Sequence, residues 1–155
     1  MSAKKKFNPK LYKEAEKIAG TAVDSFLSQF LIPQFQKIDI SEQYKAYDRQ
    51  YLNRAGGILL IEMEVKYTWD CSGSFMEKYD TVDVPARKKD SIADKYIMIN
   101  ALADTILIAD MSKIHEQPIE KKWTKYTRSG EEKFFKCSLD IFDLYFFDGS
   151  IWLKK

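Results

Sequence analysis

The segment from Ile58 to Tyr67 alternates apolar and charged residues more regularly than any other part of the chain. Successive side chains of a β-strand point to opposite faces, so the alternation predicts a strand with one apolar face, formed by Leu59, Ile61, Met63 and Val65. The other face carries Leu60, Glu62, Glu64 and Lys66. At a sheet edge such charges form an ordinary solvated surface, whereas in a central strand they must be paired or bound to a metal. The alternation alone leaves both interpretations open.

The rest of the chain predicts one N-terminal helix followed mainly by strands. Asn8 and Pro9 form a typical helix start, and the helix should end near Leu31–Ile32, before Pro33. Its apolar residues recur at helical spacing, at Leu11, Ala15, Ile18, Ala19, Ala22 and Phe26. Further strands are expected at 43–52, 75–84, 96–99, 105–109 and 133–139, whereas 140–153 fits strand or helix. We therefore expect an α/β chain of the α+β type, with a central mixed β-sheet.

Length and composition predict a single domain over residues 1–155, with residues 1–8 as a solvated tail. The 10 Phe, 3 Trp and 9 Tyr residues provide ample apolar area for a core. No apolar run is long enough to span a membrane, and the first residues do not form a signal peptide. Because Cys71 and Cys137 cannot form a disulfide framework, we expect two reduced thiols and a cytoplasmic location.

Charge and histidine content exclude some functions and leave others open. The 25 Lys and Arg residues nearly balance the 23 Asp and Glu residues, which neither favours nor excludes a nucleic-acid partner. His115 is the only histidine, which removes His-based triads and multi-His zinc sites. We expect it at the surface or in a loop.

Two basic clusters are candidates for phosphate contact. Arg87, Lys88 and Lys89 form the first, and the segment 121–128 forms the second, with a Trp and a Tyr among its cations. Cations interleaved with aromatic rings suit phosphate contact and base stacking, although solvated loops explain either cluster equally well. The residues expected to bind nucleic acid are Arg87, Lys88, Lys89, Lys122, Lys125 and Arg128.

A possible metal site involves the charged face of the 58–67 strand and the strand before it. Asn53 to Gly57 predicts a hairpin turn, which can bring Asp48 alongside Glu64. Two converging carboxylates suit a hard divalent cation such as Mg²⁺. Lys66 lies on the same face as Glu64 and could orient a water molecule or hold charge on a phosphate. This set of residues is sufficient for metal-assisted phosphodiester hydrolysis.

The same residues resemble the core of the PD-(D/E)xK nucleases, the restriction-endonuclease-like superfamily. The similarity begins at Tyr47-Asp48 and continues at Ile61-Glu62-Met63-Glu64-Val65-Lys66. Small, often phage-encoded members carry two further motifs, which are similar to Gly73-Ser74-Phe75-Met76-Glu77 and Ser91-Ile92-Ala93-Asp94-Lys95-Tyr96 here. The resemblance implies a restriction-endonuclease-like core and a Mg²⁺-dependent deoxyribonuclease, with Mn²⁺ as a substitute metal.

The resemblance also implies roles for individual residues. Asp48 and Glu64 would hold Mg²⁺ together with the main-chain carbonyl of Val65, and Lys66 would serve the nucleophilic water. The family often adds an acid from the first helix, for which Glu14 is the best-placed match, although Glu14 also fits an ion pair with Lys17.

Some choices stay open at this point. Glu62 could replace Glu64 in the metal site, and Asp39 could compete with Asp48. The partner would be DNA, with RNA as an alternative and a homodimer as a possible assembly. A non-catalytic nucleic-acid-binding or phage assembly protein on the same fold is the second hypothesis. A third is a protein-interaction domain that buries the aromatic segment from Phe142 to Trp152 against a partner.

Overall fold

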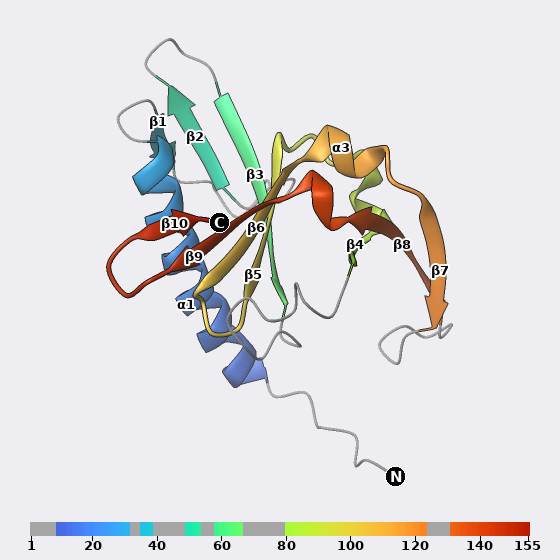
Figure 1. Ribbon diagram of the computed structural model, residues 1–155, viewed down its shortest axis with the longest axis horizontal. Helices are drawn as coiled ribbons and strands as arrows, with labels where there is room; N and C mark the ends of the chain where they lie inside the picture. Colours follow the sequence, from blue (N-terminus) through green and yellow to red (C-terminus); the bar gives the residue numbers. More distant parts are fainter. Residues whose placement is uncertain (1–8, 32–34, 39–48, 54–57, 67–79, 124–130) are drawn as a thin grey trace.

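The computed structural model describes residues 9–31, 35–38, 49–53, 58–66, 80–123 and 131–155, which form one long helix and two β-sheets (Figure 1). Helix α1 spans Pro9–Leu31, as predicted. The α+β class with a mixed sheet is also confirmed. No helix among the described residues is long and apolar enough to cross a membrane.

The larger sheet has seven described strands in the order β1-β2-β3-β5-β6-β9-β10. Their bounds are β1 Phe35–Ile38, β2 Arg49–Asn53, β3 Ile58–Lys66, β5 Lys95–Asn100, β6 Thr105–Asp110, β9 Asp143–Phe147 and β10 Trp152–Lys154. The one parallel pair among them is β3 with β5; the other neighbours are antiparallel. The strand of alternating residues is therefore an interior strand, with β2 on one side and β5 on the other.

The smaller sheet has the order β4-β8-β7, with bounds β4 Thr81–Pro85, β7 Ile119–Trp123 and β8 Glu131–Ser138. Short helices lie beside it: the 3₁₀ helices η1 (Ala86–Asp90) and η2 (Leu139–Ile141), and helix α3 (Met111–His115). Strand β7 was not predicted, because its five residues are all exposed and show no apolar alternation. It is a strand because it pairs along its whole length with β8.

One apolar cluster lies between α1 and the larger sheet. From the helix it takes Ala19, Val23, Phe26 and Leu27, which recur at the spacing of one helical face. From β3 it takes Ile61, with Leu59, Met63 and Val65 packed around it. The predicted apolar face of β3 is thus confirmed. The expectation that Ile18 belongs to the buried helix face together with Ala19 is wrong, because Ile18 is 59% exposed.

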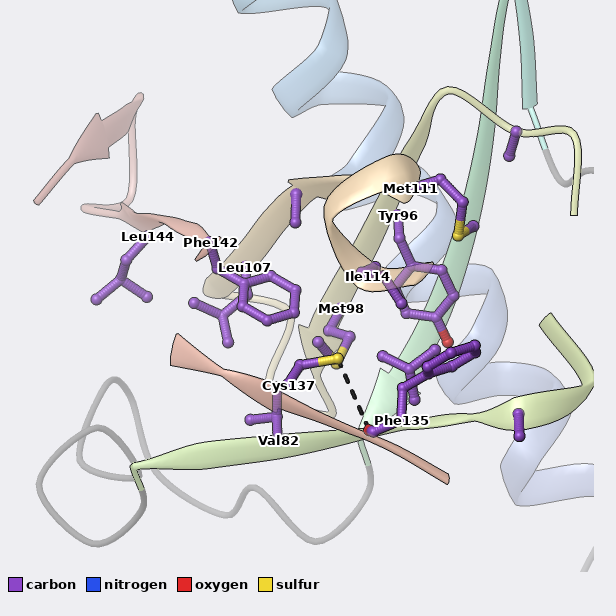
Figure 2. Close-up of a cluster of buried hydrophobic side chains, with 14 residues drawn as sticks. Val82, Tyr96, Met98, Leu107, Met111, Ile114, Phe135, Cys137, Phe142 and Leu144 are labelled. Carbon is purple, nitrogen blue, oxygen red and sulfur yellow. Dashed lines mark hydrogen bonds between the residues drawn. The ribbon is translucent and has the colours of Figure 1, made fainter. Parts of the chain in front are cut away.

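A second apolar cluster fills the space between the other face of the larger sheet and the smaller sheet. It includes Met98 and Tyr96 of β5 and Phe135 of β8, and Figure 2 shows these side chains gathered with Ile114. Cys137 belongs to it as a free thiol whose pKa burial raises to about 12. Its Sγ lies 3.7 Å from the carbonyl oxygen of Phe135, the contact dashed in Figure 2.

The C-terminal segment is resolved into η2, β9 and β10, which settles the choice between strand and helix. Its aromatic residues serve this chain's own core. Phe142 is buried in the second cluster, and Trp152 is buried in the first. These two rings are therefore covered within the chain, whereas Phe147 of the same segment is 36% exposed.

Candidate active site

The charged face of β3 points toward the smaller sheet. In parallel pairing Glu62 stands opposite Tyr96 and Glu64 opposite Met98, and both residues of β5 belong to the second cluster. Of the charged row, Glu62 is therefore buried, whereas Glu64 and Lys66 are only partly covered. The interpretation of β3 as a central strand with paired charges holds for the described residues.

Glu62 is the more deeply buried of the two carboxylates, at 5% exposure. Its Oε2 forms an ion pair with the Lys88 ammonium, and its Oε1 accepts a hydrogen bond of 3.2 Å from Ser91 Oγ. Both partners lie in or directly after η1, so that short helix supplies the compensation which a buried carboxylate requires. Each carboxylate oxygen of Glu62 thus has a partner in or next to η1, and the side chain is only 7% exposed.

Glu64 is more open, with a side chain that is 27% exposed. Its Oε2 accepts a hydrogen bond of 2.5 Å from the Tyr96 hydroxyl, and its Oε1 lies 3.0 Å from Lys66 Nζ. A carboxylate has about four acceptor sites, so these two contacts leave capacity for a further ligand. Of the two carboxylates that the sequence left as alternatives, Glu64 is the more accessible to solvent.

Lys66 lies at the end of β3 with its ammonium fixed from two sides. Nζ pairs with Glu64 and donates a hydrogen bond of 2.8 Å to the main-chain carbonyl of Asp83 on β4. An ammonium has three donors, so one remains for another acceptor. The side chain is 17% exposed.

Tyr96 is a partner of the candidate site, because its hydroxyl donates to Glu64, and the sequence did not predict this contact. Its side chain is buried, and burial raises the pKa of its hydroxyl well above the usual value, with the Glu64 charge and hydrogen bond adding to the effect. The hydroxyl therefore stays protonated and donates to Glu64 across the physiological range. The available signal was a tyrosine hydroxyl near the start of the otherwise apolar run Tyr96 to Ile99, whose residues are all buried.

The remaining predicted site residues are placed as follows. Glu14 is exposed on α1, the helix that packs against the opposite face of the larger sheet, and no described hydrogen bond or ion pair joins it to β3. Val65 lies on β3 opposite Ile99. Asp48 and its competitor Asp39 lie outside the described residues. Within the described ranges, no three Asp, Glu, His or Cys side chains gather closely enough to hold a metal.

Of the predicted cations, the structure describes Arg87, Lys88, Lys89 and Lys122, and all of these except Lys89 form ion pairs. Arg87 pairs with Glu132 at 3.1 Å, and Lys122 pairs with Asp83 at 2.6 Å. Lys88 is the partner of Glu62, while Lys89 is exposed. Lys125 and Arg128 lie outside the described residues. His115 is exposed on α3, as expected at a surface, and its Nε2 lies 2.9 Å from the Lys88 carbonyl oxygen.

No known protein family, no curated protein and no protein of solved structure matches this chain. The function is therefore inferred from the residues of the site and their contacts.

Proposed function

We propose that this protein is a metal-dependent nuclease that hydrolyses phosphodiester bonds of DNA, on a restriction-endonuclease-like core. The observation that carries the proposal is the contact between Glu64 and Lys66 on an interior strand, where both side chains stay partly exposed. A carboxylate and an ammonium kept accessible within an otherwise covered face suit chemistry on a phosphate better than a purely structural ion pair. RNA is the alternative substrate.

The oxygen donors of this region suit Mg²⁺ or Mn²⁺. Asp48, Glu64 and the main-chain carbonyl of Val65 would hold the ion, since hard divalent cations take carboxylate and carbonyl oxygens. The structure describes Glu64 but not Asp48. The two contacts of Glu64 within the chain leave acceptor sites on its carboxylate. When bound, the ion would supply a Lewis acid and favour ionisation of a water molecule.

Lys66 and Tyr96 would have different roles. Lys66 presents its third donor to the phosphate or the attacking water, and its bond to the Asp83 carbonyl keeps the ammonium in place. Tyr96 positions Glu64 by holding one carboxylate oxygen. In the overall reaction the water oxygen bonds to phosphorus, the bond from phosphorus to one ester oxygen breaks, and that oxygen takes up a proton.

The proposal is tested by incubating plasmid and linear DNA with the purified protein in Mg²⁺ or Mn²⁺. Wild type should cleave at least one of these substrates, chelation by EDTA should stop the reaction, and Asp48→Ala should abolish it. Cleavage that survives Asp48→Ala unchanged, or no cleavage of any substrate in either metal, would refute the proposal.

A non-catalytic nucleic-acid-binding protein is the second candidate function. The observation that favours it is that each oxygen of Glu64 already has a partner within the chain. Metal titration separates the candidates, because a nuclease site should bind Mn²⁺ and lose that binding in Glu64→Ala. For a protein that only binds nucleic acid, the Mn²⁺ titration should give the same heat signal for wild type and for Glu64→Ala.

A further inference from the structure

The smaller sheet extends past the core that it covers. Along β8, Phe135 and Cys137 are buried in the second cluster, whereas Lys133 on the same face of the strand is exposed. Strand β7 is exposed along its whole length and lies at the edge of the molecule, on the side away from α1 (Figure 1). A projecting end of this sheet, formed by β7 and the start of β8, is thus left open to solvent.

Three exposed side chains stand together on this projecting end. Lys121 of β7 lies directly opposite Lys133 of β8, and directly opposite residues of an antiparallel pair point to the same face. Trp123 follows two residues after Lys121, about 7 Å along the strand and on the same face. We call Lys121, Trp123 and Lys133 the β7 face.

The β7 face carries features that do not stabilise the fold. Two like charges directly opposite each other are destabilising, and neither lysine forms an ion pair within the described residues. Trp123 is 75% exposed and contacts no other aromatic ring among the described residues. The other face of the sheet differs, because there Lys122 pairs with Asp83 and Lys136 with Glu120.

We propose that the β7 face binds a single-stranded segment of nucleic acid, with Trp123 stacking on a base and the two lysines contacting phosphates. Two lysines that form no ion pair among the described residues, beside an exposed indole, match a ligand that is both negatively charged and aromatic. Stacking on a protein ring requires a base free of its duplex neighbours, which selects single strands over duplexes. Glu131 stands opposite Trp123, so the phosphates would follow the lysine side. The substrate assignment rests on the proposed nuclease function.

The proposal is tested by fluorescence anisotropy of labelled oligonucleotides with the full chain in EDTA, so that no cleavage occurs. Oligo-dT and oligo-rU of equal length distinguish DNA from RNA, and a hairpin duplex tests strandedness. Trp123→Ala should weaken binding of the preferred single strand about tenfold, whereas Trp123→Phe should retain most of it. The double variant Lys121→Ala/Lys133→Ala should lower the slope of log K against log salt by about 0.7 per lysine.

Matched controls come from the distant edge of the larger sheet, where Lys154→Ala and Ile151→Ala remove an exposed cation and an exposed apolar side chain. Both should bind like wild type. The proposal would be overturned if the protein bound the duplex more tightly than the single strand, or if Trp123→Ala bound the single strand as well as wild type does. It would also be overturned if an acidic polyglutamate peptide competed as well as the oligonucleotide. If binding needs Trp123 but no cleavage occurs in Mg²⁺, this inference is supported and the nuclease proposal is refuted. If Trp123→Ala leaves cleavage unaffected, the nuclease proposal is supported and this inference is refuted.

Discussion

The two faces of the larger sheet are each covered by another layer, but they contain different chemistry. The face under α1 packs only apolar side chains of β3, centred on Ile61. The face under the smaller sheet packs Tyr96 and Met98 around Glu62 and Glu64 of the same strand. Strand β3 therefore contributes to both faces. Its apolar side chains stabilise one face, and its ionisable side chains lie on the other.

The difference shows where the charged groups of β3 obtain their partners. A layer made of one helix offers apolar residues at helical spacing, and it meets an apolar strand face. The smaller sheet and η1 offer instead an ammonium at Lys88, a hydroxyl at Ser91 and a main-chain carbonyl at Asp83. Variants on the two faces should accordingly separate activity from stability.

The largest effect is expected at the end of the polar face. Lys66→Met keeps the length of the side chain but removes the ammonium, so the cleavage rate should fall about a hundredfold or more. Initial rates at saturating metal measure this effect, and circular dichroism checks the fold. Lys154→Met serves as the control and should cleave at the wild-type rate. A Lys66→Met variant that cleaves normally would remove Lys66 from the mechanism.

A variant on the apolar face should give the opposite outcome. Ile61→Ala leaves a cavity in a fully buried site and should lower the free energy of unfolding by about 2–5 kcal/mol. Where the protein stays folded, its cleavage rate should remain close to that of wild type. Urea denaturation measures the stability, and rates at low temperature measure the activity. A large rate loss in the folded variant would mean that the two faces are not separable.

A smaller effect on the cleavage rate is expected at Tyr96, which lies between Glu64 and the second apolar cluster. Tyr96→Phe removes the hydrogen bond to Glu64 and fills nearly the same volume, so it should cost about 1 kcal/mol of stability. Because Tyr96 positions Glu64 rather than touching substrate, the rate should fall about tenfold, and the Mn²⁺ concentration for half-maximal rate should rise. An unchanged metal dependence would show that the tyrosine only fills space.

The same variant has a pH signature. The pKa of Tyr96 is raised in the folded protein, so its stabilising contribution is complete below the unfolded tyrosine value of about 10 and declines as pH rises above it. Wild type should lose stability above about pH 10 more steeply than Tyr96→Phe, as urea denaturation at several pH values would show. Parallel curves would contradict the assignment.

Much of the fold follows from local patterns, and the exceptions have physical causes. The apolar face of β3 and the bounds of α1 were predictable because alternation and helical spacing are local signals. Strand β7 was not, since its five exposed residues lack any apolar periodicity and adopt a strand only by pairing with β8. On α1, the predicted residues Ala19 and Phe26 belong to the core cluster and Ala22 packs against it, whereas Ile18 lies outside it.

The candidate site was predictable in its residue types but not in its partners. Spacing alone placed Glu64 and Lys66 on one face, and their 3.0 Å contact agrees with this. The hydrogen bond from Tyr96 depends on the parallel register of β3 and β5, which no local pattern specifies. Likewise, the pairing of Glu62 with Lys88 depends on where η1 packs, so sequence could not separate the two glutamates.

The most direct test of the account compares these two glutamates in one DNA cleavage assay with Mn²⁺. Glu64→Gln and Glu62→Gln each remove one carboxylate from the same strand face while preserving size. The account predicts that Glu64→Gln loses cleavage with little change in melting temperature, whereas Glu62→Gln is less stable but still cleaves when folded. Loss of cleavage in a folded Glu62→Gln variant, with normal cleavage by Glu64→Gln, would contradict the assignment of Glu64 as the metal ligand.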